Sequence, residues 1–245
     1  MKAKPFAAFL LALAVVQAVG AGAAAQEGPP VQVADSLSPH YPVLLVPGWM
    51  SRAWDLSALR ERFLRDGWPV GEAVILEFAD PVGSNLDHAG ELEVAIQALR
   101  EESGAPQVDL LVHSMGGLAL WLLLREKGDE LPIRRVVFLG SPLQGTLTAH
   151  LAWGVGGEEM RPGSPILEEL AQGPGPEHWV EALTIRTPLD LTVFPVSGAT
   201  LPGMGDRVVC CPTHQGLLDH EETYRVARDF FLHGHRRDGE DGAGR

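Results

Sequence analysis

The fold is decided by the stretch at residues 108–117, VDLLVHSMGG. Its first part, 108–112, is a short apolar run with the length and β-branching of a buried strand. Ser114 follows directly, and the stretch 115–127 is long and apolar enough for a helix. A sharp strand-to-helix turn lifts a serine hydroxyl above the sheet edge, where small neighbours are needed because the backbone is crowded. The stretch predicts a nucleophilic serine at the edge of a sheet.

Short apolar runs and amphipathic stretches alternate along the rest of the chain. The predicted strands are 42–46, 73–78, 108–112, 135–139, 181–186 and 207–211. The predicted helices are 55–65, one capped by Asn85 that buries Leu92, Ile96 and Leu99, 115–127 and 221–232. This alternation predicts an α/β fold with about six mostly parallel strands and helices on both faces.

The N-terminus has the pattern of a secretory signal. Two lysines, Lys2 and Lys4, precede an apolar run at 6–19 and a small-residue stretch at 20–25 with Ala-x-Ala cleavage candidates. We therefore expect residues 1–25 to be removed and the protein to be secreted or periplasmic. The alternative is an uncleaved membrane anchor, since the same segment could just span a bilayer. No later segment approaches spanning length.

About 220 residues remain, which is the size of one ordinary domain. The expected organisation is a linker at 26–40, one domain at 41–232 with a small cap or lid at 144–180, and a disordered tail at 233–245. The segment 144–180 is set apart because it is rich in glycine and proline and has little periodicity.

The charge balance excludes one class of partner. Nineteen basic and 32 acidic residues give a net charge of −13, which becomes −15 without the charges of Lys2 and Lys4. Such a surface repels nucleic acid, and no basic stripe offsets it. No cofactor fingerprint or metal-ligand spacing occurs, so we expect neither, with a structural calcium ion as the open alternative. Cys210 and Cys211 are adjacent, and a vicinal disulfide, two thiols or an intermolecular pair are all open.

Four stretches together resemble the α/β-hydrolase family, specifically its compact bacterial lipases and esterases. They are PVLLVPGW at 42–49, VDLLVHSMGG at 108–117, LGSPLQGT at 139–146 and THQGLL at 213–218. The resemblance runs from Tyr41 to about Leu232. The chain departs from the usual Gly-x-Ser-x-Gly pattern at Val112, where a β-branched residue suits the end of a strand. The resemblance implies an α/β-hydrolase fold and ester hydrolysis through an acyl-enzyme, on lipid-like substrates.

The family places its catalytic residues in the order nucleophile, acid, histidine. The acid is expected after the fifth strand and the histidine after the sixth, which selects Asp190 and His214. His214 would take the proton of Ser114 as general base, and Asp190 would orient the imidazole and stabilise its charged form.

Rival residues fit this order less well. Asp206 precedes the last predicted strand, and Asp219 suits a charge in the first turn of the last helix. The rival bases are His220 on the surface of that helix, His233 and His235 in the tail, and His113, which is expected to point elsewhere.

The oxyanion formed in such a reaction needs two preorganised backbone N–H donors. The resemblance points to Met115, which follows the nucleophile, and to Trp49 in the loop after the first strand, where Gly48 allows close backbone approach. Four apolar residues near the catalytic edge are candidates for binding an acyl chain, although each could equally belong to the core. They are Met50, Trp54, Leu143 and Trp153.

The predicted function is hydrolysis of carboxylic esters, with a small ester or lipid as the partner. The same triad would also serve an acyltransferase or a thioesterase. A non-catalytic binding protein on a hydrolase scaffold is the alternative from another class, since fold does not imply function. The sequence leaves open the acyl-chain length and thus the choice between lipase and esterase.

Overall fold

A computed structural model describes residues 40–235 of the chain. The predicted signal segment, all of the linker except His40, and the tail from residue 236 onward lie outside the described residues. Among the helices of residues 40–235, none combines the length and the apolar character needed to cross a membrane.

The centre of the fold is a sheet of six strands in the order β2-β1-β3-β4-β5-β6, and every neighbouring pair is parallel. The strands are β1 (Val43–Val46), β2 (Ala73–Ile75), β3 (Val108–His113), β4 (Ile133–Leu139), β5 (Glu181–Arg186) and β6 (Gly205–Val208). The predicted α/β architecture is confirmed.

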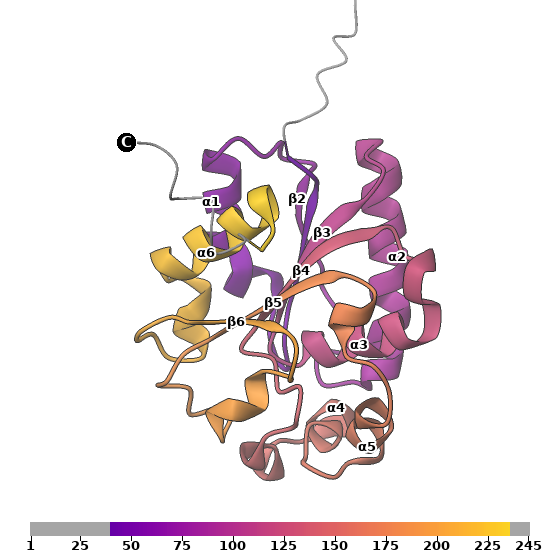
Figure 1. Ribbon diagram of the computed structural model, residues 1–245, viewed down its shortest axis with the longest axis vertical. Coiled ribbons are helices and arrows are strands. Elements are labelled where there is room, and N and C mark those ends of the chain that lie inside the picture. Colours follow the sequence, from indigo (N-terminus) through magenta and orange to yellow (C-terminus); the bar gives the residue numbers. More distant parts are fainter. Residues whose placement is uncertain (1–39, 236–245) are drawn as a thin grey trace, which may run out of the picture. The chain divides into compact units, whose positions relative to one another are not determined.

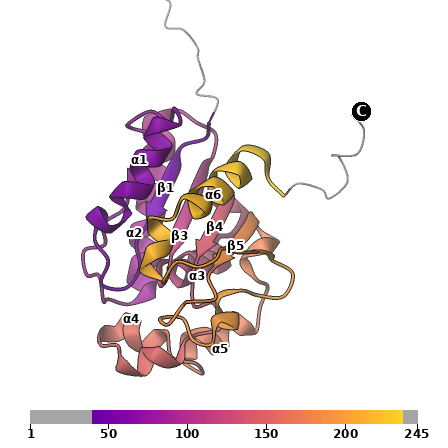
Figure 2. The same ribbon diagram turned by 90° about the vertical axis from the view of Figure 1, so that its left-hand side faces the viewer.

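Helices cover both faces of this sheet. The α-helices are α1 (Ser57–Arg65), α2 (Asn85–Ser103), α3 (Gly116–Lys127), α4 (Gly154–Glu159), α5 (Pro165–Ala171) and α6 (Glu221–His233). Short 3-10 helices occur at Ala53–Leu56, Gly128–Glu130, Leu147–Leu151, Pro176–His178, Val196–Ala199 and Gln215–Leu218. Helices α1 and α6 lie on one face of the sheet and α2 and α3 on the other, while α4 and α5 lie together beyond one end of it (Figures 1 and 2).

Two apolar clusters, one on each face, hold the layers together. Successive strand residues point to opposite faces, so Val43 and Leu45 of β1 pack with α1 and α6, whereas Leu44 and Val46 pack with α2 and α3. Each fully buried side chain of this size contributes about 1.5–3 kcal/mol. Burial on both faces is the reason that the strands are apolar runs without strict alternation.

Two strand predictions need correction. The strand expected at 73–78 ends at Ile75, because β2 is an edge strand that pairs only with β1. The last strand is Gly205–Val208 rather than 207–211, because its partner β5 ends at Arg186, which is opposite Val208. Cys210 and Cys211 therefore lie in the loop after β6, where a vicinal disulfide joins them.

The helix ends also differ in places. A 3-10 turn at Ala53–Leu56 precedes α1, so the predicted helix start is early. The cap of α2 is Ser84 rather than Asn85: its backbone is extended, and its Oγ accepts the N–H of Leu86 at 3.2 Å. Residues 233–235, which were predicted to belong to a disordered tail, include the end of α6 at His233 and a backbone N–H of His235 that donates to Glu181 Oε1 at 2.6 Å.

Candidate active site

Ser114 stands on a strained turn between β3 and α3. Its φ is 52°, and Met50, which lines the same pocket, is the other residue besides glycine with positive φ among residues 40–235. Such conformations cost about 1–3 kcal/mol and concentrate at functional sites. Close neighbours force small residues here, because a Cβ on Gly48 would lie 2.7 Å from Ser114 Cβ, and one on Gly117 would meet the Ser141 hydroxyl. The turn therefore has the geometry of a nucleophile elbow.

His214 and Asp190 form a buried pair. His214 Nδ1 and Asp190 Oδ2 are 2.8 Å apart, although 24 residues separate them in the sequence. The other carboxylate oxygen, Oδ1, accepts the backbone N–H groups of Thr192 at 2.8 Å and Val193 at 2.7 Å. An ionised carboxylate only accepts hydrogen bonds, so beside an ionised Asp190 the Nδ1 of a neutral imidazole carries the proton and Nε2 is left without one.

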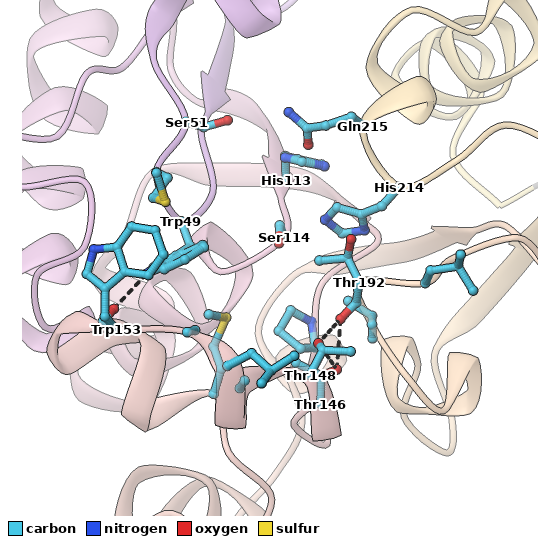
Figure 3. Close-up of a pocket in the computed structure, with 18 of the residues that line it drawn as sticks. Trp49, Ser51, His113, Ser114, Thr146, Thr148, Trp153, Thr192, His214 and Gln215 are labelled. Carbon is cyan, nitrogen blue, oxygen red and sulfur yellow. Dashed lines mark hydrogen bonds between the residues drawn. The ribbon is translucent and has the colours of Figure 1, made fainter.

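The imidazole of His214 and the hydroxyl of Ser114 line the same pocket, and Figure 3 shows the ring beside the hydroxyl. Within the described part of the chain no hydrogen bond joins the Ser114 hydroxyl to the His214 ring. Gly140 follows β4 with a φ of 56° and supports the ring closely, since a Cβ there would lie 3.1 Å from His214 Nδ1.

His113 was predicted to point away from the site, and that prediction was wrong, because its ring lies against the ring of His214. The ring centroids of His113 and His214 are 4.7 Å apart, and His113 lines the pocket. Burial, and next the nearby His214, hold the pKa of the His113 imidazole well below its usual 6.5. His113 therefore stays neutral and packs beside the ring of His214.

Two backbone N–H groups near Ser114 are available as donors. Neither the N–H of Trp49 nor that of Met115 donates to another group in the hydrogen bonds of residues 40–235. Gly48 brings the Trp49 loop against Ser114, and Met115 follows the serine directly. Trp49 and Met115 thus each carry a backbone N–H group that is free of hydrogen bonds among residues 40–235.

The pocket above these groups has a volume of about 530 Å³, within the usual range for small-molecule sites. It is lined by loops that follow β1, β3, β4, β5 and β6 and by the segment before α4. Its lining residues include Trp49, Met50, Ser51, Ser114, Thr146, Leu151, Trp153, Met160, Leu191 and His214.

No protein-family model matches the sequence. Among solved structures, lipase B of Aspergillus fumigatus superposes with a TM-score of 0.68 at 19% identity, covering 84% of this chain and 55% of that one. The mature form of a Bacillus licheniformis lipase also gives 0.68, at 15% identity over 83% of this chain and 96% of its own. The chain has the α/β-hydrolase fold. It spans about half the length of the Aspergillus protein. An N-formylmaleamic acid deformylase of Pseudomonas putida is also similar, with a TM-score of 0.52 at 16% identity over 77% of this chain and 92% of that one.

Two of the four predicted acyl-binding residues line the pocket, namely Met50 and Trp153. Trp54 and Leu143 do not. Trp54 stands outside it in the 3-10 turn before α1, with 70% of its surface exposed. Leu143 is buried in the core cluster on the α2 and α3 face, because the loop after β4 turns its side chain inward.

The rival acids, and the rival bases apart from His113, lie outside the pocket lining. Asp206 belongs to β6 rather than preceding it, and an ion pair with Arg186 (Nη2 to Oδ2, 2.8 Å) occupies its carboxylate. The others are Asp219 and His220 before α6, His233 at its end, and His235, whose Nε2 lies 3.1 Å from the Ala182 carbonyl oxygen.

Several functional residues could not be found from the sequence. The donors to Asp190 come from Thr192 and Val193, and Leu191 lines the pocket, in a loop without any periodic pattern. The sequence shows Gly140 only as a glycine after a predicted strand, which does not indicate its close approach to the His214 ring. In the part of the chain that the structure describes, no group of three or more His, Cys, Asp or Glu side chains is arranged to hold a metal ion.

Proposed function

We propose that this protein is a serine hydrolase that cleaves carboxylic esters through an acyl-enzyme. The observation that carries the proposal is the buried contact of His214 Nδ1 with Asp190 Oδ2, where His214 lines the same pocket as Ser114 on its strained turn. Nucleophile, base and orienting acid come from three loops far apart in the sequence, and their roles follow from this mutual geometry.

In the proposed reaction, Ser114 Oγ attacks the ester carbonyl while His214 Nε2 takes the hydroxyl proton. The N–H groups of Trp49 and Met115 stabilise the oxyanion of the tetrahedral intermediate. Its collapse breaks the bond to the alcohol, which leaves with the proton from His214. A water molecule then attacks the acyl-serine and gives a proton to His214. The bond between the acyl carbon and Ser114 Oγ breaks as His214 returns that proton to Oγ, and the acid is released.

Exposed apolar side chains around the pocket support a lipid-like ester as the substrate. Thirteen large apolar side chains are exposed among the described residues, and nine of them line the pocket or lie within two positions of a lining residue. We call these nine the apolar rim: Met50, Trp54, Leu147, Leu151, Trp153, Val155, Leu189, Leu191 and Phe194. Apolar surface concentrated at one place marks a binding surface, and here it lies along the segments that line the pocket.

The double variant Leu147→Ser with Leu189→Ser tests the rim, since neither residue lines the pocket itself. We expect its rate on an emulsified long-chain triglyceride to fall about tenfold, because lost burial of about 1.4 kcal/mol is a tenfold change in adsorption. The rate on soluble p-nitrophenyl butyrate should stay within about twofold. Val70→Ser with Val94→Ser is the matched control, on exposed residues away from the rim. Equal losses on both substrates would argue against a lipid-binding rim.

A fluorophosphonate probe tests the catalytic assignment directly. The wild-type protein should react once, at Ser114, and Ser114→Ala should abolish labelling, since the probe needs an activated serine. Mass spectrometry of the labelled peptide gives the site. A folded wild-type protein that stays unlabelled would exclude the hydrolase and favour a binding protein on this scaffold.

Export is a further part of the proposal and is supported by the sequence of residues 1–25. Expression of the full chain in a bacterial host should yield a protein in the periplasm or medium whose N-terminus, read by mass spectrometry, follows one of the Ala-x-Ala sites. Retention in the membrane with an intact N-terminus would instead identify an anchor.

A further inference from the structure

Both proposed oxyanion-hole residues rest against one short segment of the chain, Trp153 and helix α4. The indole of Trp49 donates from Nε1 to the backbone oxygen of Trp153 at 3.0 Å, and the two rings meet edge to face with centroids 4.6 Å apart. Figure 3 shows this contact at the side of the pocket. The thioether of Met115 is buried against Gly156 of α4, where an added Cβ would lie 2.7 Å from Met115 Sδ.

Helix α4 is itself fixed to the body of the fold through Glu159. One carboxylate oxygen of Glu159 accepts the hydroxyl of Ser84 at 2.7 Å. The other accepts the backbone N–H of Asn85 at 2.7 Å and its side-chain Nδ2 at 2.8 Å. A carboxylate at the N-terminus of α2 satisfies free N–H groups and matches the positive end of the helix dipole. Three hydrogen bonds therefore hold the end of α4 in place.

The turn before α2 connects the two sides of the proposed oxyanion hole, because its carbonyl oxygens accept hydrogen bonds from both. The carbonyl oxygen of Val82 accepts the N–H of Gly156 at 3.1 Å, and that of Pro81 accepts the N–H of Met50 at 2.9 Å. A Cβ on Gly154 would lie 2.9 Å from Val82 Cβ, so that approach also requires glycine. The segment before Ser84 thus ties the Trp49 loop and α4 into one network.

From these contacts we infer that Trp153 and α4, anchored by Glu159, position the two oxyanion-hole N–H groups relative to Ser114. Trp153 and Glu159 are positioning residues in this inference, which rests on the proposed function. The part of segment 144–180 that contains Trp153 and α4 thus acts as a fixed support of the proposed catalytic site. Preorganised donors stabilise the transition state only when they are held at the right place, and a displacement of about 1 Å can lower the rate about 100-fold.

Glu159→Ala is the sharpest test, because Glu159 does not line the pocket. With p-nitrophenyl butyrate we expect kcat to fall about 10- to 100-fold while KM stays within about threefold, since the donors act mainly on the transition state. Inhibition by butylboronic acid, whose serine adduct carries an oxyanion, should weaken in proportion to kcat/KM. If Glu159 only stabilised the fold, the loss of boronate inhibition would not follow the loss of kcat/KM.

The neighbouring variant Glu158→Ala is the matched control. Glu158 is exposed on the same helix, and its ion pair with Arg161 spans 3.6 Å. Glu158→Ala should leave kcat unchanged. Trp153→Ala, at a half-exposed position, provides a second test should Glu159→Ala fail to fold, with Val94→Ala, at an exposed position away from the apolar rim, as its control. Trp153→Ala should likewise lower kcat and weaken boronate inhibition, whereas Val94→Ala should do neither.

The outcomes separate this inference from the proposed function. Wild-type protein that is labelled at Ser114 and active, with unchanged kcat and boronate affinity in folded Glu159→Ala or Trp153→Ala, would overturn the inference alone. A loss confined to KM would also overturn it. Wild-type protein without labelling or activity would remove the proposed function, and the inference with it.

Discussion

Ser114→Ala and His214→Ala should each lower kcat on a soluble ester by about 10⁴- to 10⁶-fold. Ser114 supplies the oxygen of the covalent intermediate, and His214 carries the proton in both halves of the reaction. Because the two residues act as one unit, the double variant should be no slower than about the slower single variant. Activity that remains in all three would come from binding and the oxyanion donors at Trp49 and Met115.

Initial rates with p-nitrophenyl butyrate at saturating substrate measure this effect. His220→Ala is the matched control, because His220 precedes α6 and does not line the pocket. We expect its kcat to stay within about twofold of the wild type. If His214→Ala retained more than a hundredth of the activity, or if the two single losses simply multiplied in the double variant, His214 would not be the base for Ser114.

The architecture could be predicted because it depends on a signal that most of the strands carry. Runs such as 43–46 and 136–139 are apolar throughout, since helices bury both of their faces. Where a strand pairs on one side only, as in β2, the signal weakens, and the predicted strand was too long. The displaced last strand has a related cause: Asp206 and Arg186 pair across β5 and β6, and such polar strand residues carry no apolar pattern.

The three triad candidates could be selected from their order relative to the strands, and the structure brings Asp190 and His214 into contact. The walls of the pocket could not be selected in the same way. Leu143 and Trp153 both lie in loops after β4, yet one faces the core and the other the pocket. Loops lack the regular repeat that fixes the direction of side chains in helices and strands. Residue type alone therefore predicted Leu143 and Trp153 equally as acyl-binding residues.

Long-range polar contacts are the other part that the sequence does not reveal. Glu159 reaches Ser84 and Asn85 across more than 70 residues of sequence. As one acidic residue among 32 it carries no signal of its own. Its role depends on where the turn before α2 and the end of α4 meet, which is a property of the folded chain.

Asp190→Asn should lower kcat by about 10⁴-fold while the protein stays folded, which is the typical effect of the wrong histidine tautomer in a Ser-His-Asp triad. In the wild type the carboxylate accepts a hydrogen bond from His214 Nδ1 at 2.8 Å, which leaves Nε2 unprotonated toward Ser114. An asparagine whose Oδ1 keeps the N–H groups of Thr192 and Val193 turns its NH₂ toward Nδ1. The imidazole must then carry its proton on Nε2, and it can no longer accept the serine proton.

Asp206→Asn is the matched control for this change, since Asp206 is the other acid near the end of the sheet and binds Arg186. It should reduce stability by about 1 kcal/mol through the weakened ion pair and leave kcat within about twofold. Fluorophosphonate labelling should be slow in Asp190→Asn and normal in Asp206→Asn. The reverse pattern would assign the orienting acid to Asp206. Equal activity of both variants would mean that the contact of Asp190 with His214 maintains the fold of the loops and has no part in proton transfer.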